Sequence, residues 1–269
     1  MEGKIVVIKH VEKEGPGLIE NIFKGDGLEL ETIELSAGEE LPESLENVAA
    51  VIMLGGPMNV YEEDAYPFLK DEDRFIRKVI VEEIPFLGIC LGSQLLSKAC
   101  AGRVDKSPVK EVGWYTVELT RDGQKDLLFQ GLSKTFKAFQ WHEDTFEIPE
   151  GGMLLAKARG CKNQAFKIGN NAYGLQFHIE VTEGMVGEWM KDEEGKIDTG
   201  KILSDTKKMK ESFEKQACGI LLNFKRAIES SLRIRKIMKL FVEDEKNSRK
   251  KKTLLWWNVK EHAFIPGKV

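Results

Sequence analysis

Three short and almost uninterrupted apolar runs constrain the fold of this chain more than any other feature. They cover residues 4–11, 48–54 and 85–90, and a glycine follows each of them within a few positions. Apolar runs of this length are typical of strands that are buried on both faces, as they are in a parallel sheet. Consecutive parallel strands need a crossover connection, which is usually a helix.

Segments with helical spacing alternate with these runs. Residues 68–83 place apolar side chains three and four positions apart, residues 92–101 suit a further helix, and residues 18–23 suit a short one. Residues 28–35 alternate with period two, as a half-exposed strand does. Strands that alternate with helices predict an α/β fold with three layers, in which helices cover both faces of a mostly parallel central sheet.

The second half of the chain has a different pattern. Residues 114–178 contain strand-like stretches separated by glycine turns, and we expect them to add antiparallel strands at one side of the sheet. From residue 182 the pattern is helical to about residue 243, with a break at residues 195–200. Residues 247–252, with the sequence Asn-Ser-Arg-Lys-Lys-Lys, are predicted to form a solvated linker.

Charge divides the chain into two unlike parts. The 269 residues include 40 Lys+Arg and 44 Asp+Glu, a formal net charge of −4. Residues 231–269 hold 11 basic and 4 acidic residues, a net of +7, which leaves residues 1–230 with 29 and 40, a net of −11. We therefore predict one domain over residues 1–230 and a basic C-terminal extension, with helical character, over residues 231–269.

The extension combines basic, apolar and aromatic residues. Residues 232–242 interleave apolar and basic positions, which predicts an amphipathic helix, and Trp256 and Trp257 follow the basic segment. Opposite net charges favour packing of the extension on the acidic body or formation of a homodimer. Binding to nucleic acid or to an anionic membrane surface is the alternative that we rank lower.

Several classes of protein are not expected from this sequence. No run approaches the roughly 18–20 apolar residues of a membrane span, and the N-terminus does not have the pattern of a secretory signal. The four cysteines have no paired short spacing, so free thiols in the cytoplasm are expected. Histidines and cysteines do not fall at zinc-ligand spacing, so we predict no metal and no cofactor.

Cys90 lies where a buried strand meets a helix, with Gly88 and Gly92 two residues to either side. A nucleophile elbow requires this arrangement, because the reactive residue occupies a tight turn in which only glycines tolerate the crowding. The following helix N-terminus offers N–H groups that favour a thiolate and an oxyanion. The alternative is a buried cysteine that packs as a small hydrophobic residue, which is our interpretation of the other three cysteines.

A thiol nucleophile needs a base and a group that orients the base. His178 and Glu180 lie two residues apart in a strand-like stretch, so their side chains can face one cleft. A surface His–Glu pair at a strand edge is the alternative reading. His142, which precedes Glu143, is a rival base.

The segment Gly55-Gly56-Pro57 ends another buried run, so it is expected at the same carboxyl edge of the sheet as Cys90. The Gly56 N–H together with the Leu91 N–H would make a two-donor oxyanion hole. A plain turn that requires glycine explains the same residues equally well.

Together these motifs resemble the class I (triad) glutamine amidotransferase family. The matching segments are residues 55–57, 88–94 and 177–180, in the family's order, and the resemblance covers about residues 4–230. It implies a flavodoxin-like three-layer fold. Segments 111–114, 140–146 and 163–166 are similar to the stand-alone, GMP-synthase-like members.

The resemblance implies roles for individual residues. Cys90 would be the nucleophile, His178 the base and acid, and Glu180 the orienting carboxylate, with Gly56 and Leu91 as oxyanion donors. The substrate-binding residues that it implies are Gln94, Gln140, Trp141 and His142. Two residues depart from the common pattern: Ile179 where proline is frequent, and Glu143 where many relatives have glycine.

The implied activity is hydrolysis of a γ-glutamyl amide through a γ-glutamyl thioester, with ammonia passed to a separate synthetase. The partners expected are therefore glutamine or another γ-glutamyl compound, and a synthetase or a second copy of the chain. No glycine-rich phosphate loop with its lysine occurs, so an ATP-using domain in this chain is not expected. A self-contained γ-glutamyl peptidase and a non-catalytic regulatory or partner subunit are the alternatives.

Overall fold

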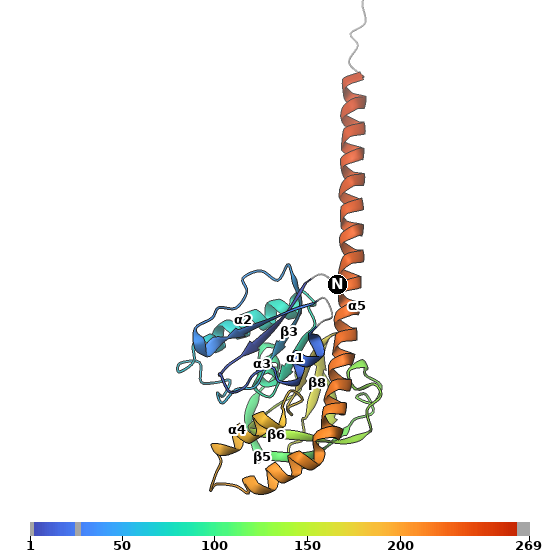
Figure 1. The fold of residues 1–269 in the computed structure, drawn as a ribbon. Helices are drawn as coiled ribbons and strands as arrows, with labels where there is room; N and C mark the ends of the chain where they lie inside the picture. The colour runs from blue at the N-terminus through green and yellow to red at the C-terminus, as the bar shows by residue number, and fades with distance from the viewer. Residues whose placement is uncertain (1–2, 25–27, 263–269) are drawn as a thin grey trace, which may run out of the picture. The chain divides into compact units, whose positions relative to one another are not determined.

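The computed structural model describes residues 3–24 and 28–262, with side chains as far as Phe241. The chain divides into two compact units, Met1–Ile228 and Glu229–Val269. The first unit contains the sheet and its covering helices, and the second contains the later part of the last helix (Figure 1).

One nine-stranded sheet forms the centre of the described part of the first unit, in the order β2-β1-β3-β4-β9-β8-β7-β5-β6. The strands are β1 (Lys4–Lys9), β2 (Glu29–Glu34), β3 (Val48–Met53), β4 (Phe86–Ile89), β5 (Val104–Leu119), β6 (Thr135–Phe146), β7 (Met153–Lys157), β8 (Ala165–Ile168) and β9 (Ala172–Leu175). Strands β2, β1, β3, β4 and β9 are parallel, and β8, β7, β5 and β6 are antiparallel to their neighbours. The predicted α/β architecture is confirmed.

Five helices accompany the sheet in the described residues. They are α1 (Leu18–Phe23), α2 (Phe68–Val81), α3 (Leu91–Ala99), α4 (Glu183–Lys191) and α5 (Thr199–His262), with short 3-10 turns at Leu35–Ala37 and Leu127–Phe129. None of the helices in the described residues is long and apolar enough to cross a membrane.

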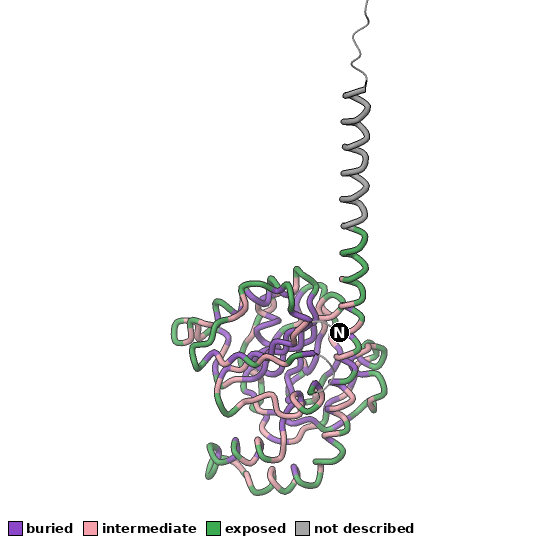
Figure 2. The backbone as a smooth tube through the Cα atoms, turned by 45° about the horizontal axis from the view of Figure 1, so that its top comes forward, coloured by how far each residue is buried: buried purple, intermediate pink, exposed green. Residues whose placement is uncertain are grey.

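Helices cover both faces of the sheet because successive strand residues point to opposite sides. Ala172 on β9 belongs to the core cluster that α2 and α3 complete. Its neighbour Tyr173 points the other way and contacts Phe224 on α5, with ring centroids 6.5 Å apart. Buried residues accordingly concentrate in the sheet and in the helix faces that lie on it (Figure 2).

Helix α5 packs through one face in its first half. The buried residues on this face recur at helical spacing: Phe213, Ala217, Ile220, Leu221, Phe224, Ala227 and Ile228. The predicted break before the helix is present, because α4 ends at Lys191 and α5 begins at Thr199.

The C-terminal part of the chain is helical where the sequence predicts a linker. The prediction of a linker at residues 247–252 is wrong, because α5 continues through them to His262. Lysine and arginine are good helix formers, so a basic segment next to an amphipathic one can extend the helix. The pair Trp256 and Trp257 lies outside the residues whose side chains are described.

Candidate active site

Cys90 occupies a strained turn between β4 and α3. Its φ is +50° and its ψ is −107°, a conformation that side-chain-bearing residues rarely adopt. A side chain at Gly88 would collide with the carbonyl of Gly92, and a side chain at Gly92 would collide with the carbonyl of Met53. The two glycines are therefore required by contact with the backbone, as the sequence pattern predicts.

His178 and Glu180 form a direct, buried pair. His178 Nδ1 lies 2.6 Å from Glu180 Oε1, and both residues are 2% exposed. The N–H of Ile179 donates to the other carboxylate oxygen, Oε2, at 2.9 Å. Proline has no N–H, so isoleucine at this position supplies a hydrogen bond to the carboxylate that proline could not make.

The geometry of this pair differs from the two-residue strand alternation expected from the sequence. Strand β9 ends at Leu175, and His178 forms only an isolated bridge with Phe139, whose carbonyl accepts from the His178 N–H at 2.9 Å. The chain bends after this bridge, and the bend brings the carboxylate of Glu180 back to the imidazole. In a regular strand the two side chains would instead extend side by side. Trp189 on α4 packs edge-on against the ring, with centroids 5.2 Å apart.

The electrostatic environment favours a charged imidazole. Burial by itself lowers the pKa of His178, but the Glu180 carboxylate and the Cys90 thiol raise it, and the resulting pKa lies well above the usual value for histidine. Nε2, the ring nitrogen not bonded to Glu180, is buried and makes no hydrogen bond in the described structure. The environment thus favours the protonated ring, with its Nε2–H available next to the thiol.

Two backbone N–H groups lie near the thiol. Gly56 follows the end of β3, and Leu91 is the first residue of α3; no hydrogen bond from either N–H occurs among the described residues. The Cβ position of Gly55 lies 3.1 Å from His178 Cε1 and 3.6 Å from Cys90 Cβ. Glycine therefore allows the loop to approach both side chains closely.

A cavity of about 650 Å³ opens above these groups. Its lining includes Cys90, His178 and Gly56 together with three predicted substrate-binding residues, Gln94, Trp141 and His142. The carbonyl of Trp141 accepts from Cys90 Sγ at 3.6 Å. Glu143 also lines the cavity, and its ion pair with Lys110, at 2.8 Å, lowers the pKa of its carboxyl.

Gln140 is the predicted substrate-binding residue that does not line the cavity. It is fully buried and its amide donates to Gln164 Oε1. We therefore assign Gln140 to the interior of the sheet.

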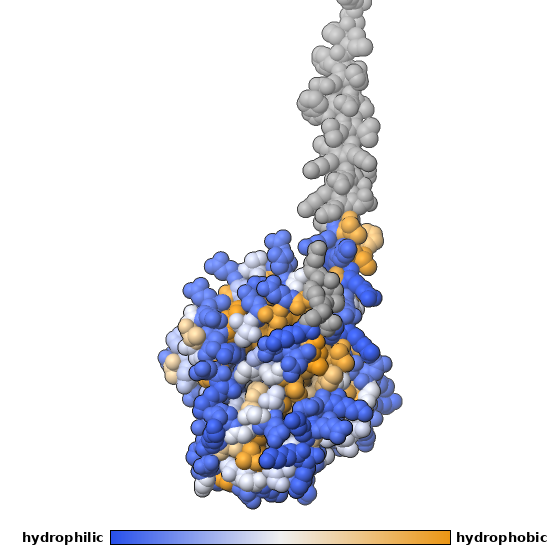
Figure 3. All heavy atoms as spheres, viewed as in Figure 1, coloured by the Kyte–Doolittle hydropathy of each residue, from blue (hydrophilic) through white to orange (hydrophobic). Residues whose placement is uncertain are grey.

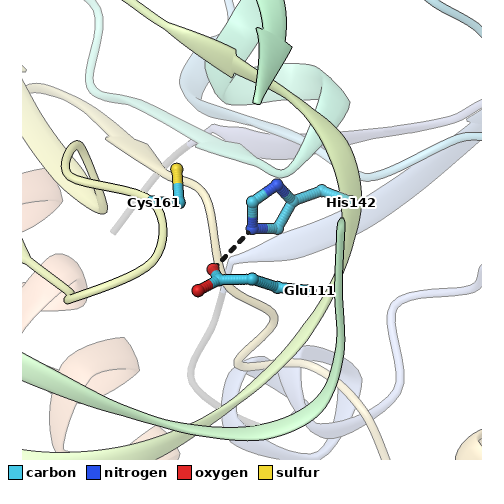
Figure 4. A group of neighbouring side chains, drawn as sticks. All are labelled: Glu111, His142 and Cys161. Carbon is cyan, nitrogen blue, oxygen red and sulfur yellow. Dashed lines mark hydrogen bonds and ion pairs between the residues drawn. The ribbon is translucent and has the colours of Figure 1, made fainter. Parts of the chain in front are cut away.

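Glu111, His142 and Cys161 form a second Cys–His–Glu group, which is buried (Figure 4). His142 Nε2 lies 3.0 Å from Glu111 Oε2, and Nδ1 donates to the Asp144 carbonyl at 2.9 Å. The three side chains offer a nitrogen, an oxygen and a sulfur atom that lie within 4.8 Å of one another. Among the described residues, this group could hold a metal ion such as zinc.

This second group differs from the elbow cysteine in its chemistry. Cys161 Sγ contacts the hydroxyl of Thr145 at 3.1 Å, and burial raises the pKa of its thiol. Both ring nitrogens of His142 are already bonded, so His142 is not a rival base for Cys90. The group instead ties β5, β6 and the loop before β8 together.

Three residues at or behind the site are absent from the sequence-based predictions. Glu14 lines the cavity, and burial raises the pKa of its carboxyl; Trp189 packs on His178; and His10 bonds to Gly55. Glu14 lies just before a Gly-Pro-Gly turn, and Gly17 of that turn has no room for a side chain against the Glu180 carbonyl. The glycines of this turn were the available signal, because they indicate a close backbone approach.

Comparison with known proteins gives a consistent result. The glutamine amidotransferase class-I family model matches residues 19–193. The glutamine amidotransferase-like protein YfeJ of Salmonella typhimurium is 29% identical over 190 residues, covering 68% of this chain and 80% of YfeJ. A glutamine-hydrolysing GMP synthase of Thermosipho melanesiensis is 36% identical over 186 residues, covering 68% of this chain and 34% of the synthase. The chain thus spans about a third of that synthase.

Solved structures agree with the family match. A glutamine amidotransferase of Thermotoga maritima superposes with a TM-score of 0.76 at 34% identity, covering 83% of this chain and 98% of the other. A second, from Methylobacillus flagellatus, gives a TM-score of 0.76 at 27% identity, covering 84% and 95%. The chain belongs to the class I glutamine amidotransferase family, whose enzymes are cysteine-dependent glutamine amidohydrolases.

Proposed function

We propose that the protein hydrolyses the γ-amide of glutamine through Cys90, His178 and Glu180 and releases ammonia to a separate acceptor enzyme. The observation that carries this proposal is the strained turn that holds the thiol at the wall of a cavity, beside a histidine bonded to a carboxylate. A thiol on a flat surface or in a closed core could not serve as a nucleophile. An acceptor for the ammonia is proposed because a glutamine-hydrolysing GMP synthase is among the relatives.

In the first half of the reaction the Cys90 thiolate attacks the γ-carboxamide carbon. The new C–S bond turns the carbonyl oxygen into an oxyanion, which the N–H groups of Gly56 and Leu91 bind. His178 Nε2–H then protonates the amide nitrogen, the C–N bond breaks, and ammonia leaves a γ-glutamyl thioester. The raised pKa of His178 supports this step, because it favours the protonated ring that the step requires.

In the second half a water molecule enters the position that ammonia leaves. His178, now neutral, takes a proton from the water, and the hydroxyl attacks the thioester carbon. Collapse of the second oxyanion breaks the C–S bond and releases glutamate. Glu180 keeps its bond to Nδ1 throughout, so Nε2 is the nitrogen that exchanges protons. Each oxyanion donor contributes about 3 kcal/mol if it behaves like such donors elsewhere.

The size of the cavity favours a second candidate function. A cavity of about 650 Å³ lies in the range that holds drug-sized ligands, and charged residues such as Glu12, Lys13 and Asp192 line it. A γ-glutamyl amide with a larger amine would use this additional space. The enzyme would then be a self-contained γ-glutamyl peptidase that expels an amine instead of ammonia.

The test is to measure ammonia and glutamate release from glutamine by the purified protein and by Cys90→Ala. We expect Cys90→Ala to lower kcat by at least about 10³-fold. Cys161→Ala is the matched control, because it removes a buried thiol of the second Cys–His–Glu group, and it should retain activity within a few-fold. Equal turnover by wild type and Cys90→Ala would refute the assignment.

A panel of γ-glutamyl peptides distinguishes the two candidates. Robust cleavage of peptides by the chain alone, faster than glutamine hydrolysis, would identify a peptidase. Weak glutaminase activity that rises when a synthetase is added would identify an amidotransferase subunit. A third outcome, folded protein inactive on every substrate, would indicate the non-catalytic alternative.

A further inference from the structure

His10 follows β1 and lies behind the loop that carries Gly55 and Gly56. Its ring is fully buried, and Nδ1 lies 2.7 Å from the carbonyl oxygen of Gly55. Nε2 lies 2.9 Å from Oε1 of Glu72 on α2, and Glu72 is also fully buried. Burying a histidine and a carboxylate costs desolvation free energy. Apolar residues of similar size would fill the core without this cost, so packing alone does not explain the pair.

The protonation of this pair follows from its partners. A backbone carbonyl and a carboxylate are both hydrogen-bond acceptors, so both ring nitrogens of His10 act as donors. The pKa of His10 is raised accordingly: burial lowers it, but Glu72 and the Gly55 carbonyl raise it by more. The Nδ1–H of His10 therefore points at the Gly55 oxygen, and the surroundings of the ring favour its protonated form.

The Gly55 carbonyl and the Gly56 N–H belong to one peptide unit. That unit is planar and trans, since the described chain contains no cis peptide bond, so its N–H points opposite to its C=O. Glycine on both sides leaves the rotation of this plane almost unrestricted. The hydrogen bond from His10 removes that freedom and thereby fixes the direction of the Gly56 N–H.

The same contact also strengthens the donor. An imidazolium that binds the carbonyl oxygen draws electron density from the amide and makes its N–H a better hydrogen-bond donor. The loop packs closely on His10. A Cβ at Gly56 would lie only 2.9 Å from His10 Cβ and 2.9 Å from Leu91 Cδ2. Thus His10 and Leu91 both pack closely against Gly56.

We propose that His10, held by Glu72, is a positioning residue that orients and polarises the Gly55–Gly56 peptide as one donor of the oxyanion hole. This inference rests on the proposed function, because it assigns the oxyanion to the Gly56 N–H. It accounts for a buried His–Glu pair behind the loop that lies next to His178. His10 does not touch the substrate in this scheme and acts through the peptide alone.

The experiment compares hydrolysis with alkylation of the same thiol. Hydrolysis of a γ-glutamyl amide passes through an oxyanion, whereas alkylation of Cys90 by iodoacetamide does not require one. His10→Leu removes the donor to Gly55, and we expect its kcat to fall about 10²-fold, with KM and the pH profile of alkylation nearly unchanged. His10→Asn places an amide N–H close to the position of Nδ1, so it should recover most of the lost kcat.

Further variants separate positioning from stability. Glu72→Gln keeps the shape of the pair but removes the negative charge, and we expect kcat to fall about tenfold with alkylation unchanged. This variant also carries the test if His10→Leu does not fold. Ile76→Val, a core change on the same helix α2, should lower stability by about 1 kcal/mol without lowering kcat.

The outcomes separate this inference from the proposed function. If folded His10→Leu, or Glu72→Gln where His10→Leu does not fold, hydrolyses substrate at the wild-type kcat, the inference is overturned and the proposed function stands. A parallel loss of alkylation and hydrolysis would also overturn it, since His10 would then act on the thiol and not on the oxyanion. If wild-type protein itself hydrolyses no γ-glutamyl amide, the proposed function falls and this inference falls with it.

Discussion

At the scale of the residue, the site depends on positions where no side chain fits. Gly92 packs on the Met53 carbonyl, Gly88 packs on the Gly92 carbonyl, and between them Cys90 adopts a positive φ. The strain in this turn is offset by the surrounding sheet and helix, which leave the chain no other path. The reactivity of the thiol therefore depends on contacts made by its neighbours.

Gly92→Ala tests this dependence. The added methyl group would meet the Met53 backbone, which cannot move without displacing β3, so we expect a loss of about 3 kcal/mol in the free energy of unfolding and loss of hydrolysis. Urea unfolding and an ammonia assay measure the two effects. Gly187→Ala on α4 is the matched control: its Cβ meets nothing within 4 Å, so it should stabilise the protein by about 0.5–1 kcal/mol.

The pH dependence of hydrolysis reports on His178. Glu180 raises the pKa of this histidine, so the imidazolium that protonates the leaving ammonia in the proposed mechanism persists above the ordinary histidine pKa of about 6.5. The alkaline limb of kcat/KM should lie well above that value. Glu180→Gln removes the charge that raises the pKa, so the limb should move to lower pH.

A pH–rate profile of both proteins measures this shift. An unmoved alkaline limb in Glu180→Gln would contradict the assignment of that limb to His178. The raised pKa also makes the free energy of unfolding depend on pH. The stabilising contribution of His178 is fully present below its pKa in the unfolded chain, and it is lost as the pH rises through its pKa in the folded protein. Stability and activity should therefore both decline on the alkaline side.

At the scale of the element, buried His–Glu pairs hold the site between strands and helices. The pair of His10 and Glu72 joins the end of β1 to α2, and the pair of Glu111 and His142 joins β5 to β6. In both, one ring nitrogen donates to a backbone carbonyl and the other faces a carboxylate. The same arrangement thus fixes two walls of one cavity.

The coupling between β5 and β6 can be measured with Glu111→Ala, His142→Ala and the double variant. Each single change leaves its buried partner uncompensated, which costs about 3–5 kcal/mol. The double variant should cost less than the sum of the two single changes, by about 1–3 kcal/mol. Additive losses in urea unfolding would show that the pair does not act as a unit.

Sequence patterns predict the elements of this fold better than the way the elements meet. The three apolar runs give β1, β3 and β4 because a strand buried on both faces has a continuous apolar sequence, and the glycines around Cys90 identify the elbow for steric reasons. The bend after Phe177 was not predictable, because it depends on the pairing of His178 with a distant strand. The placement of Gln140 away from the cavity lining was likewise not predictable, because it depends on how β6 pairs with distant strands.

At the scale of the whole molecule, one long helix links two units of different character. Helix α5 begins with a buried face in the unit Met1–Ile228 and continues into Glu229–Val269. In the second unit the described apolar residues are mostly exposed: Ile234, Ile237, Met238, Leu240 and Phe241. They form the apolar group on this stretch of α5 in Figure 3. Ile234, Ile237, Met238 and Phe241 have the spacing of one helix face, which suits a contact with another apolar surface.

Removal of residues 231–269 separates the roles of the two units. The sheet, the cavity and the triad lie within Met1–Ile228, so we expect the shortened protein to fold and to hydrolyse substrate within about twofold of the full chain. Light scattering of both proteins measures oligomeric state. Loss of a dimer upon shortening supports self-association through the extension, whereas loss of solubility or stability supports packing on the body. Loss of activity in a shortened protein that still folds would contradict the assignment of the whole site to the first unit.

A hydrogen bond joins the two turns that meet at the thiol: the N–H of Gly92, in the turn that holds Cys90, donates to the carbonyl of Leu54, just after β3, at 3.2 Å. The Gly55–Gly56 segment begins at the next residue, so neither turn can shift without moving the other. Many enzymes place their reactive groups on mobile loops that open well below the global melting point. Here the reactive groups are extensions of central strands, so heat should inactivate the enzyme and unfold the sheet at one and the same temperature.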